Sequence, residues 1–190
     1  LQRRGCLMAG PLVYFGRGRR IDVYNFTAAD LPPTEMAAGQ ARLHRFGGAG
    51  IPGRGMTVAQ HAFNLSHVVG DCPDRQRAAL IHDAPEMFTG EVPRPIKSVC
   101  PDFVAVDDRI MLRLGEVFGV PAWAFEAIKE ADTRIASDER LFMFDDLDPE
   151  DEQRCRERQL GITITPVTET VAANAWLRRF YQLFGEPTHV

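Results

Sequence analysis

The chain reads Leu80-Ile81-His82-Asp83-Ala84-Pro85-Glu86 at residues 80–86, where a histidine and an aspartate interrupt the end of an apolar helix. Burying an imidazole beside a carboxylate is costly unless a charged partner neutralises them. A divalent metal is the usual partner, because it binds imidazole nitrogen and carboxylate oxygen together. This stretch therefore predicts a metal site whose remaining ligands lie elsewhere in the chain.

Two other predicted helices place a polar residue among apolar ones. A capping box at residues 57–60 starts a helix whose apolar face includes His61. A second helix, started by Pro121, carries Asp132 in its apolar stripe. Taken singly, these two read as a hydrogen-bonded core histidine and a capping aspartate. Together with the His-Asp pair of the opening stretch they form two imidazoles and two carboxylates, a ligand set suited to Mn, Fe, Co, Ni or Zn.

The apolar periodicities predict a mainly α-helical fold in one domain. Short strands at 12–15 and 20–24 surround a glycine turn and indicate an N-terminal β-hairpin. Residues 1–30 are then a hairpin and linker belonging to the same domain as the helical bundle of residues 31–190. Further helices are expected at 34–46, 75–84, 101–118, 121–144 and 166–184.

Two segments near the C-terminal end are interpreted without a helix. Residues 145–152 hold six acids in eight positions and are expected to be a solvated loop, and residues 161–165 to be a short strand.

The helix at 166–184 is amphipathic. Its apolar side is broad enough to predict a partner surface, formed by Trp176, Leu177, Phe180, Tyr181 and Phe184.

Composition narrows the function classes. Hydrophobic residues make up 45% and charged residues 25%, with a net charge of −4, so nothing global favours a nucleic acid or a membrane as partner. The four cysteines form no C-x-x-C pair, which argues against a cysteine zinc site and favours reduced thiols in the cytoplasm. Residues 1–7 lack the apolar core of a signal peptide, and Met8 is a possible native start.

The order of these residues resembles the HD-domain phosphohydrolase superfamily, and most closely its 5′-deoxynucleotidase-like branch and the related phage deoxynucleoside triphosphohydrolases. One histidine, a His-Asp pair about twenty residues later and a distant aspartate on a late helix carry the resemblance. The matching stretches are Arg45-Phe46, Val58-Ala59-Gln60-His61, Leu80-Ile81-His82-Asp83-Ala84-Pro85-Glu86, Thr89-Gly90-Glu91-Val92-Pro93-Arg94-Pro95-Ile96-Lys97 and Glu130-Ala131-Asp132.

The resemblance implies a metal centre and a catalytic carboxylate. The ligands of one divalent ion would be His61, His82, Asp83 and Asp132, and no histidine between the last two is available for a second ion. Glu86 would act as general base or acid on a water molecule. Its other interpretation is a surface glutamate favoured in the first turn of a helix.

The resemblance also implies a substrate site. Arg45 would bind phosphate, with Arg42 as a rival, and Lys97 would be a second phosphate contact. Phe46 stands where this branch typically has a tryptophan against the ribose, and Glu91 where it usually has an aspartate near the sugar.

We therefore expect a metal-dependent phosphohydrolase that acts on nucleotides. The first expectation is a 5′-deoxynucleotidase, which removes phosphate from deoxynucleoside 5′-monophosphates. The alternatives are a deoxynucleoside triphosphate triphosphohydrolase and, from another class, a non-catalytic nucleotide or metal sensor. A structural role for the four residues in an interaction module is a further reading. By resemblance, the protein would be a homo-oligomer, and the cysteine pattern favours the cytoplasm.

Overall fold

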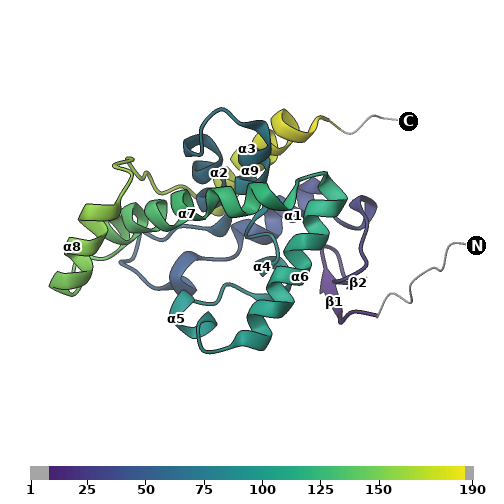
Figure 1. Ribbon diagram of the computed structural model, residues 1–190, viewed down its shortest axis with the longest axis horizontal. Coiled ribbons are helices and arrows are strands. Elements are labelled where there is room, and N and C mark those ends of the chain that lie inside the picture. The colour runs from purple at the N-terminus through teal and green to yellow at the C-terminus, as the bar shows by residue number, and fades with distance from the viewer. Residues whose placement is uncertain (1–8, 187–190) are drawn as a thin grey trace, which may run out of the picture.

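The computed structural model describes residues 9–186 as a mainly α-helical fold with one small hairpin (Figure 1). Residues 1–7, whose origin the sequence left open, lie outside the described residues. The strands are β1 (Leu12–Phe15) and β2 (Arg19–Asp22), and short 3-10 turns span Ala28–Asp30 and Arg45–Gly48. The helices are α1 (Pro33–Ala41), α2 (Val58–Val68), α3 (Pro73–Ile81), α4 (Glu86–Thr89), α5 (Arg94–Lys97), α6 (Pro101–Phe118), α7 (Ala122–Met143), α8 (Pro149–Arg158) and α9 (Glu169–Phe184).

The predicted hairpin forms, with a second strand shorter than expected. Strands β1 and β2 pair antiparallel from Leu12↔Asp22 to Phe15↔Arg19. The Asp22 carboxylate accepts the backbone N–H of Tyr24 at 2.9 Å, a local bond that ends the strand. Phe15 and Ile21 are buried in the same apolar core as the helices, so the hairpin is packed onto the bundle.

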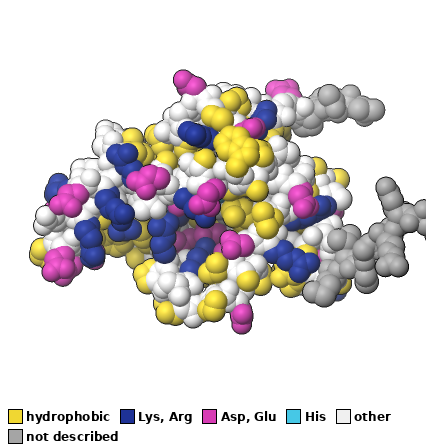
Figure 2. Space-filling model, in the orientation of Figure 1, with side chains coloured by type: hydrophobic (Ala, Val, Ile, Leu, Met, Phe, Trp, Pro, Cys, Tyr) yellow, Lys and Arg dark blue, Asp and Glu magenta, His cyan; other side chains and the backbone are white. Residues whose placement is uncertain are grey.

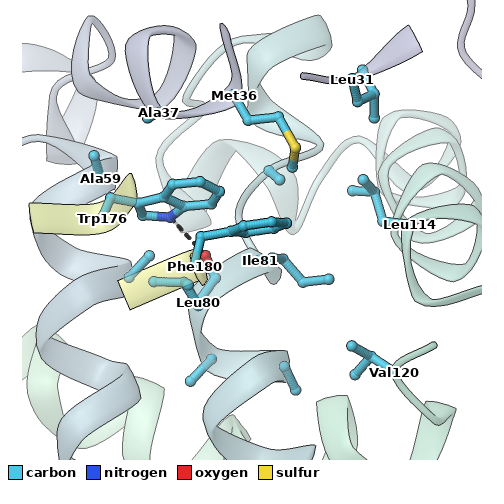
Figure 3. Packing of buried hydrophobic residues seen from close by; sticks show 14 of the residues in the cluster. Leu31, Met36, Ala37, Ala59, Leu80, Ile81, Leu114, Val120, Trp176 and Phe180 are labelled. Atoms are coloured by element: carbon cyan, nitrogen blue, oxygen red, sulfur yellow. Dashed lines mark hydrogen bonds between the residues drawn. The ribbon is translucent and has the colours of Figure 1, made fainter. Parts of the chain in front are cut away.

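The apolar side of α9 fills the core of its own chain. Trp176 is fully buried and stacks on Phe180, and α9 packs against α1, α2 and α3 (Figure 3). The Trp176 Nε1–H donates to the carbonyl oxygen of Leu80 at 2.9 Å. The prediction that this face covers a partner is therefore wrong for its central residues, because the bundle itself needs them.

The residues around the His-Asp pair break one helix into two. Helix α3 ends at Ile81 and α4 starts at Glu86, because Pro85 has no amide hydrogen to continue the ladder. Helix α2 begins at the expected cap, where the Thr57 hydroxyl accepts the Gln60 N–H at 3.1 Å. The helix expected at 34–46 stops at Ala41, and His44 then forms an antiparallel bridge to Thr57.

Two predictions near the C-terminal end are wrong. The acids at 145–152 lead into helix α8, where Asp148 caps the first turn and Pro149 follows it. Acidic side chains are favoured there by the helix dipole, so the pattern marked a helix start. Residues 161–165 form no strand, because the Asp138 carboxylate accepts the backbone N–H groups of residues 160, 161 and 162 that a neighbouring strand would have bound.

No helix within residues 9–186 is both long and apolar enough to cross a lipid bilayer.

Candidate metal centre

His61 is presented by the first turn of α2 and lies in the interior. Its side chain has no exposed surface, and its Nδ1 lies 2.6 Å from Oε1 of Glu139 on α7. A carboxylate accepts hydrogen bonds only, so this contact places the imidazole proton on Nδ1. The other ring nitrogen, Nε2, thereby faces His82 and Asp132.

His82 is fixed in the same manner at the end of α3. Its Nδ1 lies 2.9 Å from the carbonyl oxygen of Ala79, which accepts but cannot donate a hydrogen bond. Its Nε2 lies 3.1 Å from Oδ1 of Asp83, the next residue. The last turn of α3 thus orients both residues of the His-Asp pair: the Ala79 carbonyl holds His82, and Asp83 lies against the other nitrogen of His82.

Three helices bring the predicted ligands together. The Nε2 atoms of His61 and His82 are 3.4 Å apart, and Oδ1 of Asp132 on α7 lies 3.2 Å from the first and 3.8 Å from the second. One donor atom from each of these three residues falls within 4.8 Å of the others. Asp83 Oδ2 lies 3.6 Å from His61 Nε2. We call His61, His82, Asp83 and Asp132 the His–Asp cluster.

The donor set fits a divalent metal ion. Two neutral imidazoles whose lone pairs face each other at 3.4 Å repel unless a cation or a proton lies between them. Burial disfavours protonation, but the charges of Asp83 and Asp132 outweigh it and raise the pKa of His82 well above its usual value. The cluster therefore attracts positive charge, and the two imidazole nitrogens with the Asp132 oxygen suit a transition metal or zinc. Asp83 lies beside this group of three and does not belong to it.

Glu139 is a site residue that the sequence analysis missed. Both of its oxygens are used, Oε1 by His61 and Oε2 by Nε of Arg45 at 3.1 Å. Burial alone raises the pKa of Glu139, but the charges of His61 and Arg45 outweigh it and lower the pKa below its ordinary value. A signal did exist, because Glu139 follows Asp132 by two helical turns on the same face of α7.

Arg45, predicted to bind phosphate, contributes mainly to holding the cluster. Besides Glu139, its Nη1 lies 3.4 Å from Oδ2 of Asp83, and its side chain is 12% exposed. The bridge between His44 and Thr57 places Arg45 beside the start of α2. The rival Arg42 lines a separate cavity next to the hairpin.

Glu86 lies beside the cluster with one oxygen engaged and one free. Its Oε1 accepts from Nζ of Lys97 at 3.0 Å, whereas Oε2 is buried without a hydrogen-bond partner among residues 9–186. Burial and the neighbouring charge of Asp83 raise the pKa of Glu86 to about 8, although Lys97 pulls it down. Lys97 also contacts Oδ2 of Asp107 at 3.1 Å, a second residue that the sequence analysis missed.

Glu91 and Phe46 were both predicted as substrate contacts, and the side chain of Glu91 binds the backbone of Phe46. The Glu91 carboxylate accepts the N–H of Phe46 at 3.1 Å and that of Gly47 at 2.6 Å. Phe46 has a left-handed backbone with φ of 57°, which is costly for a residue with a side chain. Glu91 therefore stabilises the strained turn that follows Arg45.

Two adjoining cavities open onto the cluster. The larger, about 380 Å³, has an apolar wall that includes Met111, Phe125 and Ile128. The smaller, about 180 Å³, is polar and is lined by Arg45, Phe46, Glu91 and Arg140 among others. Asp83, Glu86, Arg94, Lys97 and Asp132 border both. Arg94, at the start of α5, places Nη2 3.1 Å from Oδ2 of Asp132.

Comparison with known proteins gives no activity. No family model matches the chain. It is 33% identical over 126 residues to an uncharacterized protein of Rhodobacter capsulatus, covering 61% of this chain and 64% of that protein. It is 30% identical over 111 residues to the uncharacterized protein YfdR of Escherichia coli, covering 58% and 60%. The chain thus matches less than two thirds of the length of either relative.

Proposed function

We propose that the protein is a metal-dependent phosphohydrolase of the HD type that acts on nucleotides. The observation that carries this proposal is the pair of imidazole Nε2 atoms 3.4 Å apart, with both Nδ1 atoms held by acceptors and two aspartates beside them. Two neutral imidazoles in this arrangement repel each other, and the aspartates beside them attract positive charge. Such a pair is accounted for by a cation that all four residues hold.

The chain's own residues divide the chemistry among themselves. His61, His82, Asp83 and Asp132 would hold the ion, which when bound would polarise a phosphate oxygen and acidify water. The unpartnered Oε2 of Glu86 would orient the attacking water and accept its proton. The water oxygen would form the new bond to phosphorus, the bond from phosphorus to the 5′ oxygen would break, and Glu86 would pass the proton it accepted to that leaving oxygen.

The two cavities suggest how the rest of a nucleotide is held. The polar cavity, with Arg45 and Lys97 in its wall, would receive phosphate oxygens, and the guanidinium fork and ammonium would offset their charge. The larger cavity offers an apolar wall to the nucleoside. A deoxynucleoside 5′-monophosphate is the preferred substrate of the proposal, and a deoxynucleoside triphosphate is the alternative.

A non-catalytic nucleotide or metal sensor is the competing function. Binding alone requires no buried carboxylate oxygen without a partner beside the cluster, so Glu86 favours the enzyme. The proposal includes a homo-oligomer, which follows from the family resemblance, and a cytoplasmic location, which follows from the cysteine pattern. Sedimentation of the purified protein tests the oligomer.

The proposal is tested by measuring phosphate and triphosphate release from a panel of nucleotides with Mn²⁺, Co²⁺, Zn²⁺, Ni²⁺ or Fe²⁺. We expect turnover of deoxynucleotides by the wild type and none by Asp132→Ala, which should also lose the metal in elemental analysis. Asp102→Ala, an exposed aspartate in the first turn of α6, is the matched control and should behave as wild type. Metal binding with no turnover of any nucleotide would contradict the enzyme and favour the sensor.

A further inference from the structure

A third cavity of about 230 Å³ lies between α7 and α8, next to the His–Asp cluster. It is lined by Thr133, Ser137, Arg140, Asp151, Arg154, Cys155 and Arg158. Thr133 follows Asp132 directly and also borders the large cavity, and Arg140 also borders the small one. The α7–α8 cavity therefore shares wall residues with both cavities of the proposed active site.

The α7–α8 cavity carries uncompensated positive charge. Arg154 pairs with Asp151, the one acid in the lining. Arg158 makes no side-chain hydrogen bond or ion pair within residues 9–186, and Arg140 has only the weak acceptor Sγ of Cys155, at 3.5 Å. Dark-blue basic side chains gather on this part of the surface, over α7 and α8 (Figure 2).

The direction of α7 links Arg140 to the cluster. Asp132, Ala136 and Arg140 are spaced by four residues and share a wall of the polar cavity. Side chains on a helix lean toward its N-terminal end, so Arg140 leans back toward Asp132. An anionic chain that extends outward from the cluster would contact Arg140 first and Arg158 further out.

We infer that the α7–α8 cavity is a subsite for phosphate groups beyond the one that lies at the His–Asp cluster. Its ligand is the polyphosphate tail of a nucleotide, because guanidinium groups without acidic partners match phosphate oxygens in charge and in hydrogen-bond geometry. The inference rests on the proposed function. Within that proposal it favours nucleotides with longer phosphate chains over the monophosphate, and it assigns the residues that would bind the additional phosphates.

The test compares two arginines of α8 that differ in where they point. Arg158 lines the cavity, whereas Arg156 pairs with Glu152 on the helix and does not line it. Calorimetric titration of Mn²⁺-loaded protein with inorganic phosphate and with inorganic tripolyphosphate gives both affinities. In Arg158→Gln we expect the affinity for tripolyphosphate to fall about fivefold to tenfold, and that for phosphate to change less than about twofold.

Arg156→Gln is the matched control and should keep the wild-type affinity for both anions. Chelation of Mn²⁺ by tripolyphosphate acts equally on both variants and cancels in the comparison. Equal tripolyphosphate affinity of the two variants, or no preference of the wild type for tripolyphosphate over phosphate, would overturn the inference. If no nucleotide is hydrolysed but Arg158→Gln still loses tripolyphosphate affinity, the proposed function fails and the subsite stands.

Discussion

Two buried glutamates flank the His–Asp cluster, and their surroundings are opposite. On the inner wall, formed by His61, Glu139 and Arg45, both oxygens of Glu139 are bound by a charged or protonated partner. On the outer wall, formed by Glu86, Lys97 and Asp107, one oxygen of Glu86 is bound and the other is buried without a partner among the described residues.

Under the proposed function, this difference separates a positioning residue from a reactive one. Glu139 has no oxygen left for another molecule, so it can only fix the tautomer of His61 and the place of Arg45. Glu86 lines both cavities and keeps one buried oxygen without a partner among the described residues, and its pKa of about 8 lies near physiological pH. Under the proposed function, a glutamate therefore positions other residues on the inner wall and takes part in the chemistry on the outer wall.

The largest expected effect is on the outer wall. Under the proposed function, Glu86→Gln should retain the metal and lower the turnover number by a factor of about 10²–10⁴, the usual contribution of a general base. Steady-state kinetics and elemental analysis on the same preparation measure both quantities. Unchanged turnover in this variant would show that Glu86 does not take the proton.

A smaller effect is expected on the inner wall. Glu139→Gln should weaken metal binding about 10–100-fold, because an amide orients the imidazole less well than a carboxylate does. Competition with a fluorescent chelator measures the affinity. The control is Glu130→Gln, an exposed position on the same helix, which should keep wild-type affinity. A loss of turnover at full metal occupancy would instead assign Glu139 a direct chemical role.

The smallest expected effect is a pH dependence of stability in the metal-free protein. The pKa of Glu86 rises from about 4.5 to about 8 on folding, so the folded state keeps a proton that the unfolded state has released in this range. The free energy of unfolding of the wild type should therefore fall relative to that of Glu86→Gln as the pH rises from about 4.5 to 8. Urea unfolding at several pH values measures the difference, and a constant difference would contradict the assignment.

The sequence predicted the structure correctly where a residue pattern is compatible with only one local conformation. Apolar periodicity with Thr57, Pro85 and Gly119 as boundaries located α2, the break after α3 and the end of α6. The approach of His61 to His82 and Asp132 followed from the cost of burying each one singly. Their convergence is observed, and their role as ligands remains a proposal.

Other features depended on tertiary partners that no local pattern contains. Glu139 resembles any acid on a long helix until His61 and Arg45 are placed against it. Glu91 was expected at a sugar, but its oxygens bind backbone N–H groups of a turn more than forty residues earlier. The face of α9 was predicted to lie on a partner, because a sequence does not tell an inner apolar face from an outer one.

The hydrogen bond from Trp176 to the carbonyl of Leu80 joins residues 96 positions apart. As the chain is synthesised from its N-terminal end, the Leu80 carbonyl oxygen, two residues before His82, stays without this donor until α9 has been made. We therefore expect the histidine pair to assemble only late in translation, after α9 has been synthesised. In nascent chains that end before α9, the imidazoles of His61 and His82 should be exposed and should not form a rigid binding site for an ion.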